Sequence, residues 1–356
     1  MRPGAMKTEI LDVSGLTDDT LRCAQALCEP GAIDIVENAM EKIRRAAAVI
    51  KRGGLVAFPT ETVYGIGANA FDDEAVRHVY EAKGRPSDNP MIVHITRASD
   101  IALLSKKLSP EIVKLADAFW PGPLTMVMEK RKEVPARVTG GLPTVGIRLP
   151  DSPVATELIR LAGTPVAAPS ANISGSPSPT KAEHVIADLD GKVDIILKGE
   201  DCRVGIESTV VDMTASPPQV LRPGIITKED IEAELGAIVD IGSSAEHEAP
   251  RSPGMKYDHY APRATMLVVE GRREKVSAEV ARLKALNEAL GLKVGVLLFE
   301  EKDYVKAAHD FYAALRNMDD EGMDMIIAGA LPGTDGVSFA VMNRMMKAAG
   351  YNVVRV

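Results

Sequence analysis

Four basic residues stand where a loop follows a predicted helix or strand. They are Lys83 and Arg85 in KGRPSDNP, Arg148 in GIRLP, and Arg222 in VLRPG. Ammonium and guanidinium groups bind phosphate and carboxylate, and arginine can hold either anion through two parallel hydrogen bonds. These residue types therefore predict a site for anionic substrates.

Neutral hydrogen-bonding side chains occupy other loops of the same kind. Ser170 and Asn172 follow the apolar segment PVAAP, Thr180 precedes a predicted helix, and Ser208 lies in GIESTVVDM. No Ser-His-Asp order, metal-ligand cluster or carboxylate pair stands out beside them. A site rich in cations and poor in nucleophiles suits two bound substrates that react directly with each other.

The segment KRGGLVAFPTETVYGIGANA, residues 51–70, raises an alternative. Gly65, Gly67 and Ala70 match the GxGxxA pattern of dinucleotide-binding turns. That interpretation needs an acidic residue about 20 positions later, at the end of the next strand. Here KGRPSDNP comes before the strand MIVHI, which disfavours it. The polar run PTETVYG is better explained as one wall of the predicted cavity.

The elements that must position these residues follow an α/β pattern. Residues 34–53 predict a helix that begins after Asp34 and ends at Gly53, and the strand LVAF follows. Beyond residue 263, continuous apolar strands alternate with helices, which is typical of a small parallel sheet covered on both faces. Strands in the first part are less regularly spaced, so we expect a mixed, twisted sheet there.

Composition divides the chain into four expected segments. These are an N-terminal extension (1–33), a catalytic domain (34–236), an interdomain linker (237–263) and a C-terminal domain (264–356). Prolines and glycines mark the linker. Its segment SPGMKYDHYAP is rich in polar and aromatic residues, so we expect it to fold back over the site as a lid.

Charge and composition exclude several classes of protein. The 356 residues carry a net charge of −8, which argues against an extended nucleic-acid surface but not against a small anionic ligand. No apolar run reaches the roughly 18 residues of a membrane span, and no apolar signal core opens the chain. The three cysteines fit neither a disulfide framework nor paired CxxC motifs. We therefore expect a cytoplasmic protein that does not contact membranes.

Six segments in order resemble the YrdC/Sua5 family, the threonylcarbamoyl-AMP synthases. They are PTETVYGIGANA, KGRPSDNPMIVHI, WPGPLTMVM, GIRLPDSP, PSANISGSPSPT and IESTVVD. The linker and the trailing MNRMMKAA are similar to the longer Sua5 subtype. The resemblance implies a YrdC-like twisted mixed sheet with helices, followed by a smaller Rossmann-like parallel α/β domain.

The resemblance also implies a nucleotidyltransferase reaction. L-Threonine, bicarbonate (or CO2) and ATP would give L-threonylcarbamoyladenylate and pyrophosphate, and a separate transferase would pass the threonylcarbamoyl group to A37 of tRNA. A carbamate oxygen attacking the α-phosphorus of ATP needs positioning and charge neutralisation more than a protein nucleophile. Mg²⁺ would accompany ATP without a dedicated protein cage. A weak contact with tRNA is a further expectation.

Matching this sequence to the motifs of the family implies roles for individual residues, which fall into three groups. Threonine contacts are expected at Thr62, His94, Arg148, Ser170 and Ser208. ATP contacts are expected at Arg85, Asn89, Thr144, Asn172, Thr180 and Arg222, with Tyr257 or Tyr260 of the linker closing over the nucleotide. Lys83 and Arg85 are the expected catalytic residues, with Lys83 near the triphosphate or bicarbonate. Spacing does not choose between the tyrosines, and by spacing alone His94 also fits a buried core histidine.

Two other functions compete with this one. A YrdC-like carbamoyl transferase of hydrogenase maturation would use carbamoyl phosphate, but such chains carry zinc-finger modules, whose paired CxxC motifs are missing here. An RNA-binding or regulatory module is the second competitor. The acidic balance and the lack of interleaved aromatic and basic residues count against it.

Overall fold

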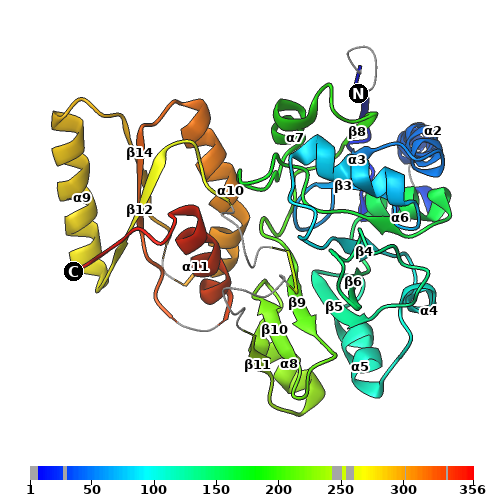
Figure 1. Ribbon diagram of the computed structural model, residues 1–356. Coiled ribbons are helices and arrows are strands. Elements are labelled where there is room, and N and C mark those ends of the chain that lie inside the picture. Colours follow the sequence, from blue (N-terminus) through cyan, green and yellow to red (C-terminus); the bar gives the residue numbers. More distant parts are fainter. Residues whose placement is uncertain (1–6, 27–29, 243–250, 254–259, 301, 334–335) are drawn as a thin grey trace.

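Two sheets organise the chain in the computed structural model, which describes residues 7–26, 30–242, 251–253, 260–300, 302–333 and 336–356. The first sheet has 11 strands and the second has four. Figure 1 shows them as two side-by-side units. Among the helices of these described segments, none is long and apolar enough to cross a membrane.

The large sheet is mixed, as predicted. Its strands in spatial order are β1 (Glu9–Asp12), β8 (Ile195–Lys198), β2 (Val56–Phe58), β3 (Gly65–Asn69), β7 (Val166–Ala167), β4 (Ile92–His94), β6 (Thr144–Arg148), β5 (Leu124–Glu129), β9 (Thr209–Asp212), β10 (Gln219–Arg222) and β11 (Asp240–Ile241). The pairs β4–β6 and β5–β9 are parallel, whereas β3–β7 and β5–β6 are antiparallel. The strands that carry His94 and Arg148 therefore end at the same edge.

Helices cover both faces of the large sheet. One core lies under α3 (Asp73–Lys83), α5 (Pro110–Phe119), α7 (Ala182–Leu189) and α8 (Lys228–Leu235), and the other under α2 (Pro30–Lys51) and α6 (Pro153–Ala162). Along β2, Ala57 belongs to the first core and Val56 and Phe58 to the second. This alternation is what a strand buried on both faces requires. The short helices η1 (Ala98–Asp100) and α4 (Ile101–Leu104) lie in the connection from β4 to α5.

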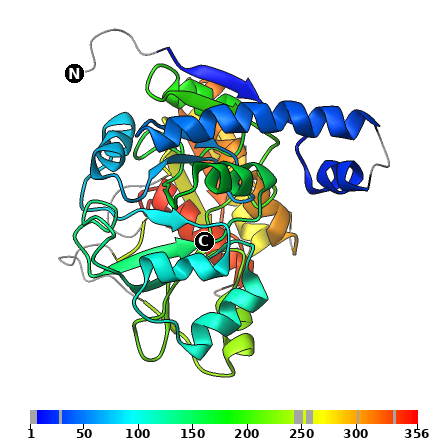
Figure 2. The same cartoon turned by 90° about the vertical axis from the view of Figure 1, so that its right-hand side faces the viewer.

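The first 33 residues contribute to this sheet, which the sequence did not predict. β1 pairs in parallel with β8, and α1 (Asp18–Gln25) packs against α2. Figure 2 shows α2 crossing the domain with β1 beside it and α1 near its far end. The predicted start of α2 is also wrong, because the helix begins at Pro30 and Asp34 lies inside it. Proline suits the first turn of a helix, where its missing N–H has no partner to lose.

A second missed element is β3, which contains both glycines of the GxGxxA match. A Cβ at Gly67 would lie 2.6 Å from Val166 Cγ1 and 2.7 Å from Phe58 Cε1. Glycine thus lets β3 approach the side chains of its neighbours closely. Its role here is packing, in agreement with rejection of the dinucleotide interpretation.

The small sheet is parallel, which confirms the predicted C-terminal α/β unit. Its order is β13 (Val294–Leu297), β14 (Met325–Gly329), β12 (Thr265–Glu270) and β15 (Val353–Arg355). Helix α9 (Arg273–Ala289) covers one face, and α10 (Tyr304–Asp320) and α11 (Gly336–Ala348) cover the other. Figure 1 shows α10 and α11 between the small sheet and the larger domain. Val63 and Ile206 of the larger domain join the core under these two helices.

Candidate functional site

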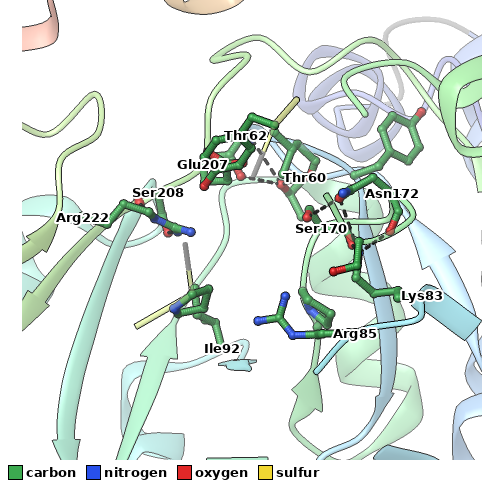
Figure 3. Close-up of a pocket in the computed structure, with 18 of the residues that line it drawn as sticks. Thr60, Thr62, Lys83, Arg85, Ile92, Ser170, Asn172, Glu207, Ser208 and Arg222 are labelled. Atoms are coloured by element: carbon green, nitrogen blue, oxygen red, sulfur yellow. Dashed lines mark hydrogen bonds between the residues drawn. The ribbon is translucent and has the colours of Figure 1, made fainter. Parts of the chain in front are cut away.

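A cavity opens where loops of the larger domain meet, with contributions from the linker (Figure 3). Its wall includes the polar segment after β2, the end of α3, β4 and β6, the loop after β7, and the residues around β9 and β10. The predicted site residues that line it are Thr62, Lys83, Arg85, His94, Arg148, Ser170, Asn172, Ser208, Arg222 and Tyr260. Residues up to 198 positions apart in sequence, Thr62 to Tyr260, thus share one cavity.

Three predicted ATP contacts lie off this cavity. Asn89 is buried beside Arg85, and Thr180 is buried with its backbone N–H donating to His184 Nδ1 at 3.3 Å. Thr144 lines a smaller adjoining pocket, which shares Ile92 and Pro253 with the main cavity. Tyr257 lies outside the described residues.

The end of α3 delivers Arg85 to the cavity. Gly84 adopts a left-handed conformation (φ 61°), which ends the helix and redirects the chain. Arg85 then donates from Nη2 to Pro90 O at 2.8 Å, and Figure 3 shows its guanidinium group pointing into the cavity. Burial lowers the pKa of Arg85 to about 10. A buried guanidinium of this kind provides a ready partner for an anion.

Lys83 lines the cavity but uses its ammonium group differently. Its Nζ donates to the backbone carbonyls of Ser170 and Asn172. Burial lowers the pKa of Lys83 well below its ordinary value. This geometry gives Lys83 a role in holding the loop after β7, whereas the sequence placed it beside a substrate anion.

A second side of the cavity is formed by the parallel strands β4 and β6. His94 lies opposite Arg148 in the register, and Arg148 Nη2 lies 2.6 Å from Glu61 Oε2. The ion pair lacks hydrogen-bond geometry: within the described structure, Glu61 Oε1 and Oε2, Arg148 Nη2 and His94 Nδ1 are buried without hydrogen-bond partners. Burial, then the Arg148 charge, lowers the pKa of His94 to about 3, so its imidazole is neutral. Such groups are poised to receive a polar ligand.

The third wall joins Ser208 to Arg222. Arg222 donates from Nε to Ser208 O at 3.0 Å and from Nη2 to Ser208 Oγ at 3.1 Å. Thr125 Oγ1 lies 2.8 Å from the same hydroxyl. Burial lowers the pKa of Arg222. Tyr260 also lines this side, with its ring 5.3 Å from that of Tyr312.

Two carboxylates of the site had no predicted role. Glu61 lies within PTETV, and Glu207 immediately precedes Ser208 and lines the cavity. Burial alone would raise the pKa of Glu207, but Arg344 and Arg222 bring it below its ordinary value. Adjacency to predicted site residues was the only sequence signal, because the partners of both acids are distant in the chain.

The lining as a whole is strongly cationic. It contains Lys83, Arg85, Arg148 and Arg222 against the single carboxylate of Glu207, which already accepts hydrogen bonds from protein donors. Across the described residues, no group of three or more His, Cys, Asp or Glu could hold a metal ion. Because Glu61 and Glu207 are already engaged by arginines, this lining favours anionic ligands over a protein-held metal.

The fold and the site together define a two-domain α/β protein whose arginines line one cavity. Residues 48–224 match the Sua5/YciO/YrdC family profile, described as telomere recombination, and residues 226–350 match the C-terminal domain of threonylcarbamoyl-AMP synthase. The chain belongs to the Sua5-type threonylcarbamoyl-AMP synthase family, as its sequence resemblance predicted.

Individual relatives support this assignment over nearly the whole length. The threonylcarbamoyl-AMP synthase of Pyrococcus abyssi is 47% identical over 329 residues, covering 88% of this chain and 96% of the relative. That of Bacillus subtilis is 49% identical over 332 residues, with 88% and 94% covered. The crystal structure of P. abyssi Sua5 complexed with L-threonine superimposes with a TM-score of 0.88 at 43% identity, covering 98% of this chain and 100% of that one.

Proposed function

We propose that this protein is an L-threonylcarbamoyladenylate synthase. It converts L-threonine, bicarbonate (or CO2) and ATP into threonylcarbamoyl-AMP and pyrophosphate. The observation that carries the proposal is the convergence of Arg85, Arg148 and Arg222, from three separate elements, on one cavity. The chemistry needs two anionic reactants close together, and this cavity supplies cations for both.

Arg148 and its neighbours are the proposed threonine site. Arg148 Nη2 is ion-paired with Glu61 but makes no hydrogen bond in the described structure, so it can donate to the carboxylate of the amino acid. Neutral His94 leaves Nδ1 available for a polar group. Thr62, Ser170 and Ser208 line the same space and complete the predicted set. A P. abyssi relative has been crystallised with L-threonine, which supports this choice of substrate.

Arg85 and Arg222 are the proposed contacts of the ATP phosphates. Asn172 and Tyr260 lie on the same cavity, and Asn89, Thr144, Thr180 and Tyr257 complete the predicted nucleotide set. The described residues do not form a cage for Mg²⁺, and Glu207 is already saturated by donors. We therefore treat Mg²⁺ as part of the ATP substrate, and no step is assigned to a protein-bound metal.

The reaction proceeds without a covalent enzyme intermediate. The threonine amine attacks carbon dioxide and loses a proton, giving a carbamate. A carbamate oxygen then attacks the α-phosphorus, and the bond from that phosphorus to the α,β-bridging oxygen breaks in line, which releases pyrophosphate. Arginine side chains neutralise the charge that accumulates on the phosphoryl oxygens and on the departing pyrophosphate.

The domain division and the cellular setting belong to the same proposal. Residues 34–236 form the catalytic domain, with β1 and α1 completing its sheet. Residues 237–263 act as linker and lid, and residues 264–356 form the C-terminal domain. The product is a water-labile mixed anhydride, so it must pass promptly to a cytoplasmic transferase that modifies tRNA, and a weak tRNA contact would assist that transfer.

Pyrophosphate release with ¹⁴C-bicarbonate tests the proposal. We expect release, and label in an adenylate, only when threonine, bicarbonate and ATP are all present. Threonine-independent release, or turnover that requires carbamoyl phosphate, would contradict it. The Arg148→Met variant should lose turnover at saturating ATP, whereas the surface variant Arg160→Met should behave as the parent.

A further inference from the structure

Glu207 connects the cavity to the C-terminal domain. Its carboxylate accepts hydrogen bonds from Ser178 Oγ at 2.6 Å, from Tyr312 OH at 3.0 and 3.1 Å, and from Arg344 Nε at 3.2 Å. Ser178 belongs to the larger domain, whereas Tyr312 lies in α10 and Arg344 in α11. A side chain that lines the cavity is thus fixed by two helices of the other domain.

Arg344 holds a second point of the same wall. Its side chain is fully buried, and Nη1 donates to the carbonyl of Pro223, the residue after Arg222. Arg344 therefore contacts Glu207, which precedes Ser208, and Pro223, which follows Arg222. Ser208 and Arg222 are hydrogen-bonded to each other. One guanidinium group therefore touches both segments that carry this pair.

This contact is more than an ordinary interdomain ion pair. A buried arginine is costly unless its charge and its donors are all matched. Arg344 meets that requirement through a cavity-lining carboxylate and through a carbonyl next to a cavity-lining arginine. Displacing Arg344 would leave Glu207 charged, buried and close to Arg222, which would draw Arg222 away from Ser208.

We propose that Arg344 is a positioning residue for the active site, acting through Glu207 to hold Ser208 and Arg222 at the cavity. Tyr312 supports the same carboxylate. The C-terminal domain thereby completes the substrate site instead of forming a separate module. This inference rests on the proposed function, since its kinetic readout is threonylcarbamoyl-AMP formation.

The chain offers a matched control in Arg316. It is another buried arginine from α10 that crosses the interface, donating to Pro177 O at 2.6 Å and pairing with Asp188 at 2.7 Å. Within the described structure, no hydrogen bond or ion pair joins it to Glu207. If the C-terminal domain merely stabilises the fold, replacing either arginine by lysine should have the same consequences.

A pair of double-mutant cycles in the full-length protein separates these cases. We expect Arg344→Lys to lower kcat/KM about tenfold or more, because lysine cannot reach both acceptors. Combining it with Glu207→Gln should cost little beyond the larger single effect, since both act on one contact. The losses from Arg316→Lys and Glu207→Gln should instead multiply.

Tyr312→Phe provides a second test in case Arg344→Lys does not fold. It removes only a single hydroxyl group. It should lower kcat/KM about threefold, within the range of one hydrogen bond, and should also couple to Glu207→Gln. Parental kcat/KM in Arg344→Lys, or multiplied losses with Glu207→Gln, would overturn the inference. An inactive parent protein would instead contradict the proposed function.

Discussion

The most unusual individual residues are the buried ionisable groups of the proposed threonine site. Glu61 and Arg148 compensate each other's charge, but Glu61 Oε1 and Oε2 and Arg148 Nη2 lack hydrogen-bond partners within the described structure. Protein interiors rarely leave such groups unsatisfied unless a ligand completes them. These unsatisfied atoms are best explained if a bound substrate supplies their missing hydrogen-bond partners.

The Glu61→Gln variant tests this view of the ion pair. Removing one partner of a buried pair should lower the free energy of unfolding by about 3–5 kcal/mol. Added threonine should then raise the melting temperature more than in the parent, because its carboxylate replaces the lost charge. Glu157→Gln breaks the more exposed pair with Arg160 and should cost under about 1 kcal/mol. Equal threonine responses in parent and variant would contradict the assignment of Arg148.

His94 gives the protein a predictable sensitivity to acid. Its pKa is about 3 in the folded protein against 6.5 when exposed, so below pH 6.5 the unfolded chain binds a proton that the native state refuses. Stability must therefore fall as the pH drops through this window. Between pH 7 and 5 the His94→Gln variant should lose about 2 kcal/mol less than the parent in urea unfolding. Equal losses of stability in the parent and in His94→Gln would contradict a neutral, buried His94.

At the scale of elements, the sequence predicted most helices and strands that deliver the site. Ser109, Ser152 and Thr227 cap α5, α6 and α8, because their hydroxyl groups accept hydrogen bonds from N–H groups in the first turn of each helix. The predictions failed for strands whose local sequence pattern carries little information. β1 is a short strand whose partner, β8, lies far along the chain, and β3 contains glycines selected by packing.

The sequence likewise predicted most, but not all, of the residues that line the cavity. The motifs of the family resemblance located nine cavity residues near the ends of strands or helices, and left Tyr260 open against Tyr257. Glu207 and its partners were not predictable, because hydrogen bonds that span 105 and 137 positions leave no local signal. The engagement of Lys83 with backbone carbonyls was likewise invisible to residue type.

The end of α3 allows an element-scale prediction. Alanine at Gly84 would have to adopt φ near +61°, which costs about 1 kcal/mol and would shift Arg85. Gly163 ends α6 with φ +67° and, like Gly84, has open space around a built Cβ. Gly84→Ala and Gly163→Ala should thus lose similar stability, but only Gly84→Ala should raise the KM for ATP. Parental kinetics in Gly84→Ala would contradict the role of this turn.

At the scale of the whole molecule, the two domains behave as one packed body. The core under α10 and α11 includes Val63 and Ile206 of the larger domain. Gly205 marks a close approach of the two domains, where an added Cβ would lie 2.3 Å from the backbone Cα of His309. Because the atoms in the way belong to the backbone of His309, this position has no room for any side chain.

Gly205→Ala should therefore separate the domains. We expect the parent to unfold in one calorimetric transition and the variant in two, with a loss well above the roughly 1 kcal/mol attributable to its positive φ. Gly236→Ala provides the control, because Gly236 also has positive φ but meets nothing within 4 Å. A single unshifted transition in Gly205→Ala would show that the interface is not tightly packed.

The distance along the chain between Glu207 and its partners matters during synthesis. Arg344 emerges 137 residues after Glu207, which at 5–20 residues per second is a delay on the order of ten seconds. Throughout that interval a nascent catalytic domain exposes a carboxylate and the apolar surface of Ile206 to water. The full set of contacts that fixes Glu207 can therefore form only after the last helix of the C-terminal domain has been synthesised.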